Sequence, residues 1–372
     1  MLSGMPETMP AFRLSAWQVP PRITRVPVPV PAAGELLLRV RATGICHSDL
    51  HVMSAEPGVM SFEPPFTLGH EVAGTVARVG AGVTGFAPGD AVVVHGVWAC
   101  GECGPCLSGR ENYCARDRPA VGCGLGRDGG LAPFVLVPSQ RHLVDAGGLA
   151  PHLAAPLTDA GLTSLHALNR SRSRLGVDAV VAVIGIGGLG HLAIQLLRTL
   201  TTATVVAVDT RAAARDLGLR CGATEVHGDT DPALAAVGRH SAGRGADLVL
   251  DFVGAQPTVD LAARLVAPDG DLTIVGGAGG EIRVGKHLGL PAGCRISMPF
   301  WGTRAELADL VTLARRGLVV PEVEQFEFID VAAAYERLRA ATILGRAVVM
   351  SRTEPGLADE TELNSVHAHP AR

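Results

Sequence analysis

The sequence predicts an α/β protein with two domains, one rich in β-strands and one built on a doubly wound parallel sheet. Its 372 residues are enough for about two domains. The hydrophobic periodicity also changes along the chain. Up to residue 145 it shows short β-like runs separated by Gly and Pro, and from residue 178 it shows apolar strands alternating with helical stretches. The second pattern is typical of βαβ units on a parallel sheet.

The individual elements follow from these two patterns. In the first part, four runs have the composition of β-strands: 36–45, 71–79, 91–95 and 134–137. In the second part, apolar strands and helix-like stretches alternate: strands 180–184, 205–208, 248–252 and 272–275, with helices near 188–200, 211–221 and 258–266. Helical patterns at 304–316 and 331–340 and a short strand at 346–350 follow. The tail, 354–372, has few large apolar residues and is predicted to be disordered.

Composition and charge exclude several classes of function. The net charge of −4, from 32 Lys and Arg against 36 Asp and Glu, gives no basic surface. Nucleic acid and anionic membrane are therefore unfavourable as main partners, and a small molecule is predicted instead. Lys286 is the only lysine, and Tyr113 and Tyr335 are the only tyrosines, so the Tyr-x-x-x-Lys dyad of some reductases is absent.

Four of the eight cysteines, Cys100, Cys103, Cys106 and Cys114, have the spacing C-x₂-C-x₂-C-x₇-C. Four thiolates in one short lobe can surround one Zn²⁺ and close its coordination sphere, so a structural zinc site is predicted. A redox cysteine pair and an iron–sulfur cluster are the alternatives; the absence of a Cys-Pro pair and the neighbouring glycines favour zinc. Such thiols indicate a reducing compartment, and we expect a cytoplasmic protein.

A glycine-rich turn, Gly185-Ile-Gly187-Gly188-Leu-Gly190, follows the strand 180–184 and opens an apolar helix. The first glycine permits a tight turn, the second lets the backbone approach a pyrophosphate, and the third allows close packing of the helix on the strand. The turn also interrupts an uncharged stretch, 179–197, that otherwise has the length of a membrane span. A dinucleotide site is favoured over a glycine turn without a cofactor.

The predicted second strand of this part ends at Asp209, 19 residues after Gly190. A carboxylate at this distance is expected to bind the ribose 2′-hydroxyl and to repel a 2′-phosphate, so NAD is predicted rather than NADP. Arg211 lies nearby and could accommodate that phosphate. A solvated residue at the start of a helix, or an adenine contact, is the interpretation that we favour for Arg211.

Thiol, imidazole and carboxylate side chains also occur in three other segments. These are Gly44-Ile-Cys46-His47-Ser48-Asp49-Leu-His51, Gly69-His70-Glu71 and Pro156-Leu-Thr-Asp159-Ala-Gly-Leu-Thr163. With the cysteine cluster and the glycine turn, they make the chain resemble the zinc-dependent medium-chain alcohol dehydrogenases from about residue 30 to residue 350. The run Gly69-His70-Glu71-x₂-Gly74-x₅-Gly80-x₂-Val83 matches that family's zinc signature. The runs at 157–161 and 301–304 look like the bacterial NAD-dependent secondary alcohol dehydrogenases.

The resemblance implies a GroES-like catalytic domain over residues 1–160 and 300–353, with a structural zinc lobe at about 96–118. Residues 161–299 would form a Rossmann cofactor domain, so the chain would leave the catalytic domain and return to it. The resemblance also implies two Zn²⁺ per chain, one catalytic and one structural. A homo-oligomer is expected, with a tetramer favoured over a dimer.

Carried over onto this sequence, the family pattern implies Cys46, His70 and Asp159 as the ligands of the catalytic zinc. Asp159 departs from the commonest pattern, which has a cysteine there, although some bacterial members carry aspartate. Oxygen donates less than sulfur, so such a site is expected to be more Lewis acidic. Glu71 is expected to support a ligand or to act as an alternate fourth ligand, and Asp49 to hydrogen bond to a ligand.

An open zinc position would activate an alcohol whose carbon passes a hydride to the nicotinamide ring. The resemblance implies that Ser48 accepts the alcohol proton and relays it through the cofactor ribose to His51 and solvent. Imidazole suits this role because its charge changes near neutral pH. A helix N-cap for Ser48 and a plain surface position for His51 are the alternatives.

Further residues are assigned by the resemblance. Thr163 is expected beside the nicotinamide and Arg346 beside the pyrophosphate. The other cofactor contacts implied are Leu189, Val253 and Gly276. A substrate pocket walled by Phe62, Leu125 and Trp301 would favour hydrophobic alcohols and ketones, with core packing as the alternative for the first two.

The function that these residues imply is an NAD-dependent zinc dehydrogenase of secondary alcohols and ketones. A zinc dehydrogenase of primary alcohols or formaldehyde is one alternative. A non-catalytic protein that retains the cofactor domain is another.

Overall fold

The computed structural model describes residues 6–116, 120–286 and 288–351, and it divides into two compact units. Unit 1 comprises Met1–Asp159 and Val323–Arg372, and unit 2 comprises Ala160–Glu322. The expected return to the first domain at residue 300 differs from this division, because α9 (Arg304–Arg315) packs against α4 (Ala160–Arg172) inside unit 2. The predicted disordered tail, 354–372, lies outside the described residues.

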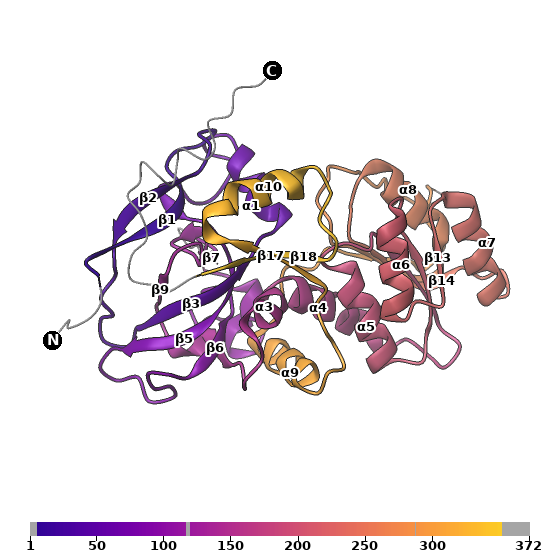
Figure 1. Cartoon of the computed structure of the whole chain (residues 1–372). Helices are drawn as coiled ribbons and strands as arrows, with labels where there is room; N and C mark the ends of the chain where they lie inside the picture. The colour runs from indigo at the N-terminus through magenta and orange to yellow at the C-terminus, as the bar shows by residue number, and fades with distance from the viewer. Residues whose placement is uncertain (1–5, 117–119, 287, 352–372) are drawn as a thin grey trace, which may run out of the picture. The chain divides into compact units, whose positions relative to one another are not determined.

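Unit 1 is built mainly from β-strands (Figure 1). Its larger described sheet has the order β10-β6-β5-β3-β18-β17, and β9 also pairs with β3. These strands are β10 (Leu143–Asp145), β6 (Ala91–Val94), β5 (Glu71–Val79), β3 (Leu36–Gly44), β18 (Arg346–Met350), β17 (Val323–Glu327) and β9 (Phe134–Val137). The four strands predicted in the first part are confirmed, and two of them end one residue earlier than predicted. All these pairs are antiparallel except β17 with β18.

The other elements of unit 1 are short. A small sheet has the order β2-β1-β4, and two further strands form a separate pair. Their bounds are β1 (Thr8–Leu14), β2 (Arg22–Pro27), β4 (Phe66–Thr67), β7 (Gly122–Cys123) and β8 (Gly126–Arg127). The helices are α1 (His47–Ser54), α2 (Gly104–Leu107), α3 (Pro151–Ala154) and α10 (Val331–Arg339), with 3₁₀ turns η1 (Glu111–Tyr113), η2 (Gln140–His142), η3 (Ala155–Thr158) and η4 (Phe328–Asp330).

Strand β3 is buried on both faces along its leucines, Leu36–Leu38, whereas its two arginines, Arg39 and Arg41, are half-buried. Leu36 and Leu38 pack into one hydrophobic cluster, together with Val72 of β5. Leu37 points to the opposite face and packs into a second cluster with Phe134. Because successive side chains of a strand alternate between faces, consecutive leucines fit the part of β3 that is covered on both faces.

Unit 2 contains a six-stranded parallel sheet with the order β13-β12-β11-β14-β15-β16. Numbered along the chain from β11, this is the 3-2-1-4-5-6 order of a Rossmann fold. The strands are β11 (Val180–Ile184), β12 (Thr204–Val208), β13 (Glu225–His227), β14 (Ala246–Asp251), β15 (Val266–Ile274) and β16 (Arg295–Ser297). The helices, besides α4 and α9, are α5 (Gly190–Leu200), α6 (Ala212–Cys221), α7 (Thr230–His240) and α8 (Gln256–Leu265).

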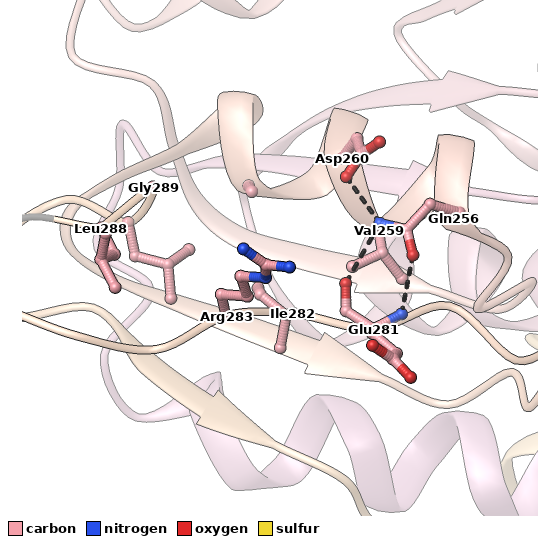
Figure 2. Close-up of a pocket in the computed structure, with 10 residues that line it drawn as sticks. Gln256, Val259, Asp260, Glu281, Ile282, Arg283, Leu288 and Gly289 are labelled. Carbon is pink, nitrogen blue, oxygen red and sulfur yellow. Dashed lines mark hydrogen bonds between the residues drawn. The ribbon is translucent and has the colours of Figure 1, made fainter.

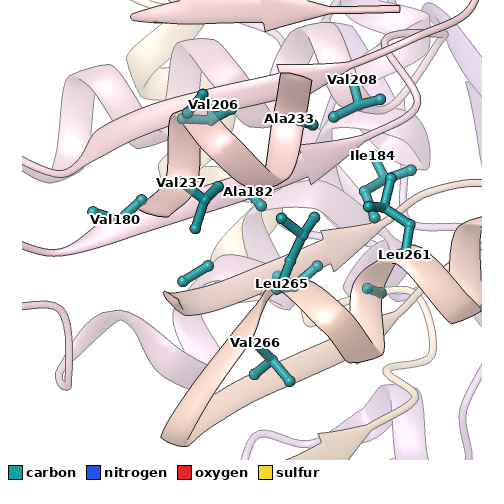
Figure 3. Close-up of a cluster of buried hydrophobic side chains, with 14 of the residues drawn as sticks. Val180, Ala182, Ile184, Val206, Val208, Ala233, Val237, Leu261, Leu265 and Val266 are labelled. Atoms are coloured by element: carbon teal, nitrogen blue, oxygen red, sulfur yellow. The ribbon is translucent and has the colours of Figure 1, made fainter. Parts of the chain in front are cut away.

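One hydrophobic cluster of unit 2 lies between the sheet and helices α7 and α8 (Figure 3). Val206 of β12, Val237 of α7 and Leu265 of α8 all belong to this cluster. The sequence analysis did not predict α7, because its buried side chains are mainly alanines, Ala233 and Ala236, which give a weak apolar pattern.

The uncharged stretch 179–197 forms β11, the glycine turn and most of α5. In the described part of the chain, none of the helices combines the length and apolarity needed to cross a membrane.

Candidate functional site

Cys46, His70 and Asp159 lie together in unit 1 although they are far apart in sequence. Strands β3 and β5 pair so that Gly44 faces Glu71. The residues just beyond Gly44 and just before Glu71 therefore meet at one edge, and Asp159 reaches them from the end of η3. The sulfur of Cys46 lies 3.4 Å from Oδ2 of Asp159, and so does Nε2 of His70.

The donor set of this group fits a catalytic zinc ion. One ligand atom from each of the three residues lies within 4.8 Å of the others, and all three residues are buried. A thiolate, an imidazole and a carboxylate are all zinc ligands, and three protein ligands leave one tetrahedral position for a substrate. The structure thus brings together the three residues that the resemblance implied.

Asp49 orients two of these three residues. Its Oδ1 lies 3.1 Å from Nδ1 of His70, and its Oδ2 accepts the backbone N–H of Cys46 at 3.0 Å. Burial alone would lower the pKa of His70, but the carboxylates of Asp49 and Asp159 raise it well above its ordinary value. Because Nδ1 faces Asp49, Nε2 is left to face the metal position.

Glu71 and Arg346 form a buried ion pair beside this group. Nε of Arg346 donates to Oε2 of Glu71 at 3.0 Å, and Nη2 donates to Oε1 and, at 3.2 Å, to Oδ2 of Asp159. Burial raises the pKa of Glu71 to about 7, against the opposing effect of the guanidinium. A Cβ on Gly44 would overlap Oε2 of Glu71, so glycine at that position makes room for the pair.

This arrangement differs from the expectation for Arg346. The resemblance implies a pyrophosphate partner, whereas in unit 1 the side chain is 3% exposed and faces two buried carboxylates. Buried carboxylates need such a cation, because an unpaired buried charge is strongly destabilising. A contact between Arg346 and the cofactor stays a prediction.

The two residues of the predicted proton relay lie on the exposed side of α1. Ser48 and His51 are both exposed, and Oγ of Ser48 lies 3.6 Å from the sulfur of Cys46. Cys46 is the N-cap residue of α1, so the alternative of an N-cap role for Ser48 is wrong. The relay itself stays a prediction.

The four clustered cysteines face one another in a half-buried lobe. The sulfur atoms of Cys100 and Cys106 are 3.8 Å apart, as are those of Cys103 and Cys114. Backbone N–H groups near Cys106 and Ala115 lower the pKa of Cys103 to about 6, whereas burial raises that of Cys106 to about 12. Four converging sulfurs leave no open position, which is the arrangement of a structural zinc site.

The glycine turn of unit 2 has the geometry that a dinucleotide site needs. Gly185 has φ +88°, and a Cβ there would lie 2.7 Å from Val253. A Cβ on Gly190 would overlap the carbonyl oxygen of Gly185, and one on Gly276 would overlap the backbone of Val253. Around Gly187, by contrast, only the end of Arg211 lies within 4 Å of a Cβ position. The turn is thus closed on its protein side and open where a phosphate would approach.

Two further residues brace this turn, and one of them was not predicted. Oδ2 of Asp209 accepts the N–H of Ile186 at 2.8 Å. His191, which is fully buried, donates from Nδ1 to the carbonyl of Gly187 and accepts the N–H of Glu322 at Nε2. The spacing of the glycine motif contains no signal for the histidine, because its second partner lies 131 residues away.

Asp209 and Arg211 are paired with each other. Arg211 donates from its backbone N–H and Nε to Oδ1 of Asp209, and from Nη2 to Oδ2 at 3.0 Å. Partial burial would raise the pKa of Asp209, but these hydrogen bonds lower it, so the carboxylate is ionised. Arg211 is the N-cap residue of α6, in line with the interpretation as a residue at the start of a helix.

The remaining predicted residues are divided between the units. Phe62 and Leu125 are buried in unit 1, where Phe62 packs edge-on against Phe66. Thr163 lies in the first turns of α4 in unit 2. Trp301, also in unit 2, is buried at φ +54°, a left-handed conformation that is unusual for a bulky residue. Backbone strain of this kind often marks functional sites.

A surface hollow of about 510 Å³ lies between α8 and residues 281–283 and 288–290 of unit 2 (Figure 2). None of the predicted site residues lines it. The amide of Gln256 bonds to Asp260 and to the backbone of Glu281. Through Gln256, Asp260 and Glu281 are therefore linked by hydrogen bonds at the hollow. We assign the hollow no function.

Comparison with known proteins agrees with both units. Residues 32–147 match the alcohol dehydrogenase GroES-like domain, and residues 188–316 match the zinc-binding dehydrogenase family. Two curated relatives match nearly their full lengths. D-arabinose 1-dehydrogenase (NADP(+)) of Saccharolobus solfataricus is 31% identical over 91% of this chain and 97% of its own. The NAD-dependent alcohol dehydrogenase of Sulfurisphaera tokodaii is 30% identical over 92% of this chain and 100% of its own.

A solved structure is similar over both units. Acetophenone reductase from Geotrichum candidum, solved in complex with NAD, has a TM-score of 0.82 and 30% identity, covering 94% of this chain and 99% of that one. The resemblance found in the sequence is thereby confirmed, as are a GroES-like and a Rossmann-like part. The chain belongs to the zinc-dependent medium-chain alcohol dehydrogenase family.

Proposed function

We propose that this chain is an NAD-dependent zinc alcohol dehydrogenase that interconverts secondary alcohols and ketones. The observation that carries the proposal is the buried convergence of Cys46, His70 and Asp159, with Asp49 behind two of them. A non-catalytic protein has no need of three buried ligands with an open fourth position. Such a position is a requirement of a catalytic zinc site.

The residues of unit 1 have separable roles in this reaction. Cys46, His70 and Asp159 would hold zinc, which polarises the substrate oxygen when it is bound. Ser48 lies beside the sulfur of Cys46, where its hydroxyl can accept the substrate proton, and exposed His51 can pass that proton to water. The Glu71–Arg346 pair adds a buried carboxylate and a compensating cation next to Asp159.

The preference for NAD rests on Asp209. Its ionised carboxylate lies 19 residues past the glycine turn and would repel a 2′-phosphate. Arg211 is already bonded to that carboxylate through two side-chain nitrogens, which lowers its availability for a phosphate. The names of the relatives include both cofactors, so both have to be tested with this chain.

The preference for secondary alcohols and ketones rests on the sequence runs at 157–161 and 301–304 and on one structural neighbour, a reductase of the ketone acetophenone. Phe62, Leu125 and Trp301 are the proposed apolar walls of the pocket. Such walls favour hydrophobic substrates over formaldehyde, because a small polar substrate gains little from burial against them.

A substrate panel tests the proposal. Absorbance at the NADH band is followed with NAD and either 2-propanol or 1-phenylethanol, against ethanol and formaldehyde, and again with NADP. We expect higher kcat/KM for the two secondary alcohols and for NAD. Faster turnover of ethanol or formaldehyde would favour the primary-alcohol alternative. No turnover of any alcohol by protein that holds its metals would favour the non-catalytic one.

We also propose two zinc ions per chain, a homotetramer and a cytoplasmic location. The two groups of clustered ligands support the metal count, and the free thiols of the cysteine lobe support a reducing compartment. Metal analysis should give about two zinc ions per chain. Light scattering tests the tetramer, and a mass of one or two chains would contradict it.

A further inference from the structure

Tyr335 is a buried tyrosine that the proposed reaction does not use. It lies on α10, is 2% exposed, and its hydroxyl donates to Oδ2 of Asp49 at 2.9 Å. Asp49 belongs to α1, so this hydrogen bond joins α10 to α1. The two bonded residues are 286 positions apart in the sequence. Helices α1 and α10 pack together in unit 1 (Figure 1).

The carboxylate of Asp49 is fully buried and is shared among three groups. Its Oδ1 faces Nδ1 of His70, while its Oδ2 accepts both the N–H of Cys46 and the hydroxyl of Tyr335. Two of the three proposed zinc ligands are therefore tied to the same carboxylate. Without the phenol, Oδ2 would keep only the backbone donor, and the carboxylate would have more freedom to rotate.

We propose that Tyr335 is a positioning residue of the zinc site, whose hydroxyl holds Asp49 in the orientation that aims His70 and Cys46 at the metal. The proposal rests on the proposed metal site and adds an outer residue to it. Its physical basis is that hydrogen bonds behind a ligand set the ligand's tautomer and direction, and that their loss typically weakens metal binding about 10–100-fold.

Two observations make the hydroxyl a dependable donor. Burial and the neighbouring Asp49 raise the pKa of Tyr335 well above its ordinary value, so the phenol stays protonated. Its ring also stacks on Phe12, with centroids 5.8 Å apart and planes 15° from parallel. The stacking locks the ring, and a locked ring presents its hydroxyl to Asp49 without a further loss of rotational freedom.

Packing and hydrogen bonding can be separated by three variants. Tyr335→Phe removes the hydroxyl and keeps the ring. Phe12→Leu weakens the stacking and keeps the hydroxyl. Asp49→Ala removes the acceptor oxygens that Tyr335 and the two ligands share.

The readout is the affinity of the catalytic metal, measured by competition with a zinc chelator, together with the thermal midpoint. We expect Tyr335→Phe to weaken the more labile zinc about 10–100-fold with a small change in thermal midpoint. Phe12→Leu should lower the thermal midpoint and weaken zinc binding less than Tyr335→Phe does, because a leucine still packs against the ring and the hydroxyl is kept. Equal zinc affinity in the wild type and Tyr335→Phe would overturn the proposal.

A double-mutant cycle gives a sharper test. If Tyr335 acts through Asp49, the loss of affinity caused by Tyr335→Phe should disappear in the Asp49→Ala background, which has no side-chain acceptor for the phenol. Additive losses would instead mean that Tyr335 acts by another route, and the proposal would be wrong. A wild-type chain that binds only one zinc ion would contradict the proposed function itself, and thus the two failures are distinguishable.

Discussion

The two groups of metal-ligating residues in unit 1 are built in opposite ways. The four cysteines of the lobe come from one segment of fifteen residues and are half-buried, and in the described hydrogen bonds no charged side chain reaches their sulfur atoms. Cys46, His70 and Asp159 span more than a hundred residues, are buried, and are backed by Asp49, Glu71 and Arg346.

The two groups obtain their geometry in different ways. The lobe has little hydrophobic core of its own, so the metal has to supply its folding energy. The buried group is shaped by the sheet that carries it, so the protein supplies the geometry and the metal supplies chemistry. Four variants test this distinction between the two groups, and they follow in order of decreasing expected effect.

Cys103→Ser should have the largest effect, and mainly on stability. Zinc binding at a structural site contributes about 10 kcal/mol or more to folding. The thermal midpoint of the variant should therefore fall by at least about 10 °C. Differential scanning calorimetry and metal analysis measure the two consequences. Cys123→Ser, at a buried cysteine outside the lobe, is the control that keeps both metals. A folded Cys103→Ser variant with an unchanged midpoint would show that the lobe does not depend on its metal.

Asp159→Ala should act mainly on activity. It removes one proposed ligand and the carboxylate partner of Arg346, so the metal content should fall from the proposed two to about one per chain. We expect a loss of about 10³-fold in kcat/KM, which corresponds to about 4 kcal/mol, with the fold retained. Asp159→Cys, which restores a zinc ligand, should regain the metal. If Asp159→Ala retains two metals and full activity, Asp159 is not a ligand.

Gly44→Ala should destabilise the buried group without touching a ligand. The added Cβ would overlap the Glu71 carboxylate, which cannot move without breaking its pair with Arg346. Overpacking of a buried site costs about 1–3 kcal/mol, measured as a shift in the urea midpoint. Gly176→Ala controls for the general effect of losing a glycine, because no atom lies within 4 Å of the Cβ position there and the backbone is not left-handed. A midpoint equal to that of the wild type would show that the site is not tightly packed.

Glu306→Gln tests how the degree of burial decides the direction in which the pKa of a carboxyl group shifts. Partial burial alone would raise the pKa of Glu306, but hydrogen bonds from His166, Asn169 and Thr303 lower it to about 2. Glu71 is fully buried, and its pKa is raised because the effect of burial exceeds the opposing effect of Arg346. Because the folded-state pKa of Glu306 is depressed, its contribution is complete above about pH 4.5 and is lost as pH falls toward 2.

The variant should therefore be about 2 kcal/mol less stable than the wild type at pH 7, measured by urea unfolding. The gap should stay constant down to about pH 5 and narrow below about pH 4.5. A gap that widens on acidification would mean that the sign of the pKa shift is wrong.

Much of the fold could be predicted because it is written in short stretches of sequence. The predicted strand 180–184 is the observed β11, and 346–350 is the observed β18. A short, valine-rich apolar run between turn residues favours a buried strand. The N-terminal strands β1 and β2 and helix α7 were missed, since alanines and interspersed prolines give no clear period.

The candidate site was only partly predictable. The ligands and the glycine turn carry local motifs, and the family resemblance rests on these motifs. The pairing of Arg346 with Glu71 and of Tyr335 with Asp49 spans 275 and 286 residues, and no spacing rule reaches so far. In the sheet, Gly44 pairs with Glu71 on one side and with Val348 on the other. This register brings β18 to the site.

The apolar strands such as β11 and β18, the glycine turn and the cysteine lobe could be predicted from the sequence alone, because backbone dihedrals and nearest-neighbour spacing set those features within a few residues. Only the tertiary structure decided what stands behind the metal ligands. The return of β18 and α10 into unit 1 supplies a guanidinium and a phenol to carboxylates from the first quarter of the chain. Such contacts depend on sheet register and helix packing, which are properties of the whole folded unit.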